Sequence, residues 1–128
     1  MRIFNQVEPW TSKVNFVDEN NVFLGYDMEQ SCCEDANWFI SDRVCNRYPE
    51  DAAIRDTDWS GWVFDTAYFH QVFDKDGEWY FDGGGMVVFR IVNGDREMFV
   101  HLYNCHNGYY GHGFDFKVND QTIREGCL

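Results

Sequence analysis

Residues 86–104, MVVFRIVNGDREMFVHLYN, decide the fold that we expect for this chain. Two apolar runs, 86–92 and 97–104, flank Asn93-Gly94, and an Asn-Gly pair between such runs is the strongest short-range signal of a β-hairpin. Side chains in a strand alternate between two faces, and here both faces carry bulky residues. A strand that is apolar on both faces is covered on both sides, so we expect this hairpin to lie centrally in a sheet.

Further strands are expected on both sides of this hairpin. Residues 13–17 and 22–26 enclose the turn-forming run 18–21, DENN, which predicts a second hairpin. Segments that are aromatic, β-branched or alternating suit a pleated, half-buried surface. Such segments occur at residues 3–7, 62–73, 78–82 and 114–118.

One or two short helices are also expected. Ser31 and Glu34 have the S-x-x-E spacing of a capping box, and residues 38–40 would close the apolar side of a helix within 28–41. A loop is the alternative there. Residues 48–53 could begin a second helix.

The fold class that follows is α+β, a mainly antiparallel β-sheet with one or two short helices. The length of 128 residues suits a single domain over residues 1–128. Its polar end, residues 119–128, is expected to be a loose tail.

The charge is strongly acidic, −12 with a pI near 4.4. Binding to a phosphate backbone needs clustered Lys and Arg, so direct nucleic-acid binding is not expected, and neither is an anionic membrane surface. A basic protein, a polyamine or a divalent metal fits this charge better. The alternative is that the charge only keeps the protein in solution.

Five cysteines are present, an odd number that does not suit a framework of disulfides. The chain opens without a charged and apolar leader and holds no apolar run long enough to span a membrane. We therefore expect a cytoplasmic protein with reduced thiols. No phosphate-binding loop, dinucleotide fingerprint or kinase signature is present.

The unusual chemistry lies in two stretches, YDMEQSCCE at 26–34 and HLYNCHNGYYGHGF at 101–114. They hold three of the four histidines and three of the five cysteines. The candidate catalytic residues are Cys33 and His106, because a thiolate needs a nearby base. The candidate binding residues are Asp27, Glu34, Asn107, Tyr109, Tyr110 and His112.

Three kinds of site are consistent with these residues. Glycines beside Tyr109 and Tyr110 favour a recognition surface, on which Asp27, Glu34 and their acidic neighbours would meet a basic partner. Cys33 with His106 would form a thiol site. Cysteine and histidine are also zinc ligands, but the C-x-x-C spacing is missing, so neither a metal nor another cofactor is assigned.

The two stretches resemble a family of small bacterial and phage domains of unknown function. The resemblance rests on Tyr26-Asp27, on Ser31-Cys32-Cys33-Glu34, and on residues 106–111, HNGYYG, with Phe114. Residues 42–82 match nothing typical of that family. The resemblance implies a compact fold in which both motifs contribute to one polar site, and it implies no activity.

The function expected from the sequence is therefore that of a small acidic cytoplasmic binding protein. It would be of the inhibitor or immunity type, masking a basic partner. The alternative is a small metal- or thiol-dependent enzyme whose site uses Cys33, Glu34, His106 and His112. A third alternative is a component of a larger assembly, with the aromatic surface as an interface.

Overall fold

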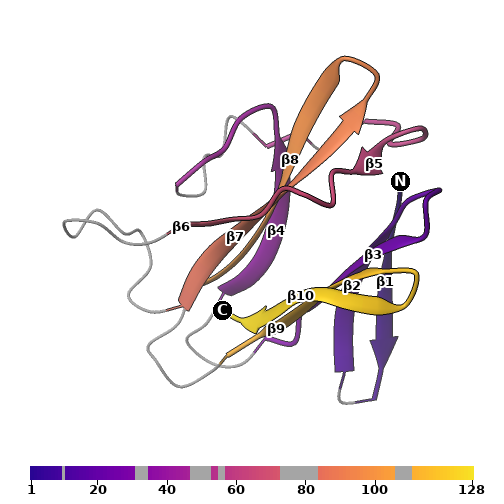
Figure 1. Cartoon of the computed structure of the whole chain (residues 1–128). Helices are drawn as coiled ribbons and strands as arrows, with labels where there is room; N and C mark the ends of the chain where they lie inside the picture. Colours follow the sequence, from indigo (N-terminus) through magenta and orange to yellow (C-terminus); the bar gives the residue numbers. More distant parts are fainter. Residues whose placement is uncertain (10, 31–34, 47–52, 55–56, 73–83, 106–110) are drawn as a thin grey trace.

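The structure is a computed structural model that describes residues 1–9, 11–30, 35–46, 53–54, 57–72, 84–105 and 111–128 (Figure 1). In these residues the chain forms ten β-strands and no helix. Every strand pair is antiparallel. The antiparallel sheet is thus confirmed, whereas the α+β class is wrong for the described chain. No helix that could cross a membrane occurs in these residues.

The strands form two sheets. Sheet A has the order β1 (Arg2–Glu8), β2 (Thr11–Val17), β3 (Val22–Asp27), β9 (Gly113–Val118), β10 (Gln121–Cys127). Sheet B has the order β4 (Asp35–Ser41), β8 (Arg96–Cys105), β7 (Gly84–Asn93), β5 (Val63–Phe64), and β6 (His70–Val72) also pairs with β7. The sequence colours of Figure 1 show sheet A built from both ends of the chain and sheet B from its middle.

The main core lies between the two sheets. Phe16, Leu24 and Phe116 reach it from sheet A, and Phe89 and Leu102 reach it from sheet B, all fully or almost fully buried. The rings of Phe89 and Phe116 meet edge to face, with centroids 4.9 Å apart. Burial of such side chains is the main stabilising term of the fold.

A second apolar cluster covers the outer face of sheet B. Phe39, Met86, Val88 and Phe99 are buried there against Cys45, and Ala53 and Tyr68 pack on the cluster. Strands β7 and β8 are therefore covered on both faces, which is why their sequences are bulky on both. The prediction of a central hairpin at 86–104 is confirmed, since β8 and β7 are the inner strands of their sheet.

Strand β4 occupies the segment where a helix was expected. It pairs with β8 from Asp35↔Cys105 to Ser41↔Phe99. The strand directs Ile40 into the main core and Phe39 into the outer cluster, which a one-sided helix could not do. Pairing and two-sided burial override the local capping signal. Residues 31–34, which carry that signal, and most of the second expected helix at 48–53 lie outside the described residues.

The end of the chain is a strand where a loose tail was expected. Asn119 and Asp120 have φ of 51° and 65°, the double positive geometry of a type I′ hairpin turn. Strand β10 follows and pairs with β9. Its side chains are polar because they are mostly exposed, so composition alone suggested a tail. The predicted hairpin at 13–26 and the strand at 114–118 are confirmed.

Candidate functional site

The two motif stretches attach to the same end of the sandwich. After β3 the chain passes from sheet A to β4 in sheet B, and after β8 it passes back to β9 in sheet A. Asp35 and Cys105 are strand partners in sheet B, and Tyr26 and Phe114 are partners in sheet A. We call this part of the molecule the crossover end; its described residues are 26–30, 35–36, 103–105, 111–113 and 128.

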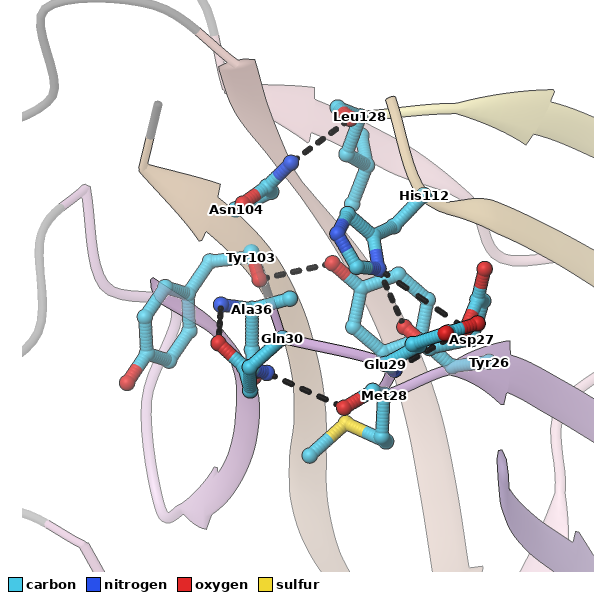
Figure 2. A network of polar contacts seen from close by, with 10 residues as sticks. All are labelled: Tyr26, Asp27, Met28, Glu29, Gln30, Ala36, Tyr103, Asn104, His112 and Leu128. Atoms are coloured by element: carbon cyan, nitrogen blue, oxygen red, sulfur yellow. Dashed lines mark hydrogen bonds and ion pairs between the residues drawn. The ribbon is translucent and has the colours of Figure 1, made fainter. Parts of the chain in front are cut away.

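Two candidate binding residues from different motifs are in contact at the crossover end (Figure 2). His112 Nδ1 lies 2.9 Å from the main-chain oxygen of Asp27 and 3.9 Å from its carboxylate oxygen Oδ1. The main-chain oxygen can only accept, so Nδ1 carries the proton and donates it. The imidazole is buried, whereas the Asp27 side chain is 35% exposed. The histidine therefore positions the end of β3 and leaves the carboxylate facing solvent.

A second set of bonds ties the two sheets together beside this pair. The Tyr26 hydroxyl donates to the main-chain oxygen of Tyr103, 2.7 Å away, from sheet A to sheet B. Asn104 Nδ2 donates to the main-chain oxygen of Leu128 at 3.0 Å. Main-chain bonds of 2.9 Å run in both directions between His112 and Leu128. The crossover end is thus a fixed framework and not a set of independent loops.

The connection from β3 to β4 is held by the side chain of Gln30. Its amide accepts from Ala36 N at 3.0 Å and donates to Ala36 O at 2.6 Å and to Met28 O at 3.1 Å (Figure 2). The Asp27 carboxylate accepts from Glu29 N at 3.0 Å. These bonds set the backbone from which three carboxylates project: Asp27, Glu29 and Asp35.

Those three carboxylates form no ion pair with a lysine or arginine in the described part of the chain. Lys13 is the strand partner of Asp27, but the two make no salt bridge. Glu29 and Asp35 are exposed. The crossover end therefore presents negative charge to solvent over a rigid base.

The other candidate residues lie outside the described residues. They are Cys33, Glu34, His106, Asn107, Tyr109 and Tyr110. Among the residues that are described, no group of three or more His, Cys, Asp or Glu side chains could hold a metal ion. The thiol and metal sites stay predictions from the sequence.

His101 belongs to the second motif stretch but lies elsewhere. It is fully buried in the outer face of sheet B and stacks on Phe39 with ring centroids 4.2 Å apart. Its Nε2 accepts a hydrogen bond from Cys45 N at 3.0 Å, and Nδ1 donates to Phe99 O at 3.1 Å. Burial lowers the pKa of this imidazole to about 4. His101 is therefore a neutral structural residue that holds the 42–46 segment against the sheet.

Sequence reasoning missed Gln30 and Asn104 as parts of the framework. Each is a neutral amide beside a more conspicuous motif, and amides at such positions are usually solvated. The Gln30 side chain forms the bonds to Ala36 that a neighbouring strand would form. Its position just before β4 is the only signal of this role, and that signal was not visible because a helix was expected there.

Comparisons with known proteins found no match among protein-family models, curated proteins or solved structures. The resemblance to small bacterial and phage domains therefore stays a prediction that rests on the two motifs alone.

Proposed function

We propose that this protein is a non-catalytic binding protein that covers a basic partner, and that the crossover end makes the contact. The observation that carries the proposal is that Asp27, Glu29 and Asp35 project from a hydrogen-bonded framework and form no ion pair with a described lysine or arginine. Complementary charge on a preorganised surface favours fast and selective association, because little order has to be imposed on binding.

The distribution of cations supports the proposal. Four described cations lie over aromatic rings: Arg2 over Phe4, Arg96 over Trp62, Lys117 over Phe23 and Arg124 over Phe69, at 4.7 to 5.7 Å. Arg43 and Arg90 pair with carboxylates away from the crossover end. These six basic side chains thus contact rings or other acids and do not neutralise the carboxylates of the crossover end.

A basic protein of the kind that an inhibitor or immunity protein masks is the partner class we favour. Direct binding to a nucleic acid is disfavoured by the same charges. The thiol- or metal-dependent enzyme remains the alternative, and no observation on the described residues favours it.

We include a reducing, cytoplasmic location in the proposal. Cys45 is buried and Cys127 is exposed, and both are free thiols in the described chain. Exposed free thiols persist most readily in a reducing compartment.

The test is the affinity for a labelled oligoarginine peptide, measured by fluorescence anisotropy at physiological salt. The double variant Glu29→Gln/Asp35→Asn should bind roughly fivefold more weakly, since each exposed charge contributes a few tenths of a kcal/mol to about 1 kcal/mol. The hydrogen bonds of Gln30 with Ala36 use neither carboxylate, so the fold should be unchanged.

The matched control is Glu19→Gln/Asp120→Asn, which removes the same charge from exposed turns at the opposite end of β3 and β9. This control should weaken binding by less than about twofold. Equal losses in the two double variants would show that only net charge matters and that the site is misplaced. Absence of binding by the unmodified protein would contradict the proposal itself.

A further inference from the structure

The free edges of the two sheets are not equally protected. An exposed edge strand presents unpaired N–H and C=O groups that can pair with another chain, and proteins block such edges with side chains, bulges, charges or very short strands. Among the strands that the structure describes, three of the four free edges are blocked in one of these ways.

Strand β4 has its outward backbone groups bonded. The Gln30 amide bonds both N and O of Ala36. The Asn37 side chain accepts from Trp38 N at 2.9 Å, and Ile54 N donates to Ile40 O at 2.7 Å. Alternate residues along this edge are thus closed to a further strand.

The opposite edge of sheet B is short. Strand β5 has two residues and β6 has three. The outward N–H of Phe64 donates to the buried Asp18 carboxylate at 2.8 Å. In sheet A, β10 carries an irregularity in its register between Thr122 and Arg124, which twists an edge away from partners.

Strand β1 is neither short nor bulged, and its charges, Arg2 and Glu8, lie only at its two ends. It pairs with β2 over seven residues, from Arg2↔Val17 to Glu8↔Thr11, without a break in register. It contains no proline, and no described residue outside β2 bonds to the main chain of residues 2–8. Val7 is 76% exposed and Phe4 is 38% exposed. This edge is long, regular and partly apolar.

We propose that β1 is a homodimer interface, in which it pairs antiparallel with β1 of a second copy about a two-fold axis at Asn5. The sequence of the strand, RIFNQVE, is complementary to itself in this arrangement. Arg2 of each copy lies opposite Glu8 of the other, and Ile3 lies opposite Val7. The two sheets A join into one continuous sheet.

The register is decided by charge and apolar contact. A shift of two residues, the smallest that keeps the backbone hydrogen bonds and the side-chain faces in phase, moves the axis and separates Arg2 from Glu8. Only the register centred on Asn5 pairs both charges and both aliphatic side chains. Opposite charges and aliphatic pairs directly across an antiparallel ladder are stabilising, and like charges are destabilising.

The net charge of −12 on each copy opposes association. At physiological salt the screening length is about 8 Å, so charges farther apart than this are largely screened. The Arg2–Glu8 pairs would be in direct contact and are screened less. The dimer should therefore be measured at physiological salt and should weaken at low salt, where long-range repulsion dominates.

Sedimentation equilibrium of the whole chain tests the proposal through a charge exchange. Arg2→Glu and Glu8→Arg should each weaken the dimer at least about tenfold, because each places like charges opposite at two symmetric positions. The double variant Arg2→Glu/Glu8→Arg should restore it to within about threefold of the unmodified protein. Both side chains are exposed, and circular dichroism checks the fold.

Val7→Lys should also weaken the dimer, since an edge lysine blocks strand addition. The matched controls Ile123→Lys and Arg124→Glu, on the exposed strand β10, should leave it unchanged. A protein that stays monomeric at every concentration, or a dimer that the β10 variants break, would overturn the proposal. So would single charge changes that the double variant fails to repair.

Discussion

His101 shows how one buried side chain can couple stability to pH. Its ring is buried on the outer face of sheet B, stacks on Phe39 of β4 and accepts a hydrogen bond from Cys45 N through Nε2. That bond requires the neutral ring, because a protonated Nε2 cannot accept. Burial lowers the pKa from about 6.5 to about 4, so the unfolded chain binds a proton more readily than the folded one.

The contribution of His101 to stability is complete above pH 6.5 and is lost as the pH falls toward 4. The loss amounts to roughly 3 kcal/mol once both states are protonated. In His101→Gln this histidine titration is absent. The difference in unfolding free energy between the unmodified protein and the variant should therefore shrink across that window. Urea unfolding at several pH values measures it.

The control for this experiment is Thr122→Gln, because Thr122 is exposed on strand β10 and neither side chain titrates. This variant should follow the unmodified protein at every pH. A constant difference between His101→Gln and the unmodified protein from pH 7 to pH 4 would show that His101 does not titrate as expected.

At the scale of single residues, the sequence could nominate Asp27 and His112 because charged and titratable residues in unusual stretches stand out. It could not show that they touch. Their contact depends on two crossovers that lie at one end of the sandwich, and residues 85 positions apart carry no local signal of this. For the same reason the sequence could not show that His101 is a buried structural residue and not part of the site that its neighbours suggest.

Strand β4 depends on the side chain of Gln30 at its outer edge. Replacing Gln30 with Glu keeps the length of the side chain and the acceptor for Ala36 N, but it removes the donor to Ala36 O. A carboxylate would then face a carbonyl oxygen. We expect a loss of about 1–2 kcal/mol in the free energy of unfolding, the cost of an unmade bond at a partly buried site.

Hydrogen exchange provides the second measurement for Gln30→Glu. The amide of Ala36 should stay protected, since its acceptor remains, whereas Gln30→Ala should expose it. Asn37→Asp is a suitable control, because either side chain supplies the oxygen that accepts from Trp38 N. Unaltered protection of Ala36 in Gln30→Ala would contradict the role given to Gln30.

At the scale of elements, the sequence predicted the strands whose pattern is set by local turns. The Asn-Gly turn and the run at 18–21 identify two hairpins that the structure confirms. The errors occur at edges. Strand β4 follows a helix-like start signal at residues 31–34. Strand β10 is exposed on both faces, so its sequence shows no apolar alternation. In both cases partner strands distant in sequence decide the conformation.

For the whole molecule, Asp18 is a link between the two sheets. Its Oδ1 accepts from Asn20 N and Val22 N in the β2–β3 turn, at 2.9 and 3.0 Å. Its Oδ2 accepts from Phe64 N of sheet B, at 2.8 Å. Asp18→Ala should reduce the free energy of unfolding by about 3 kcal/mol, because hydrogen bonds to a charged group are stronger than neutral ones.

Chemical unfolding measures this loss, and the exposed neighbour supplies the control. Glu19→Ala should change the unfolding free energy by less than about 0.5 kcal/mol. Asp18→Asn should be intermediate, since its amide keeps one acceptor but turns a donor toward a backbone N–H. If Asp18→Ala changed the unfolding free energy as little as Glu19→Ala, the Asp18 hydrogen bonds between the sheets would not contribute to stability.

The same arrangement of sheets has a consequence for synthesis on the ribosome. Sheet B is encoded without interruption by residues 35–105, whereas sheet A needs strands from residues 2–27 and from 113–127. In a nascent chain β1, β2 and β3 therefore emerge first. The edge of β3 that pairs with β9 stays unpaired until β9 has been synthesised. Until then the apolar faces of Phe16 and Leu24 have only the growing sheet B to cover them. Throughout this interval the unprotected edge of β1 is open to pairing with other nascent copies of the chain.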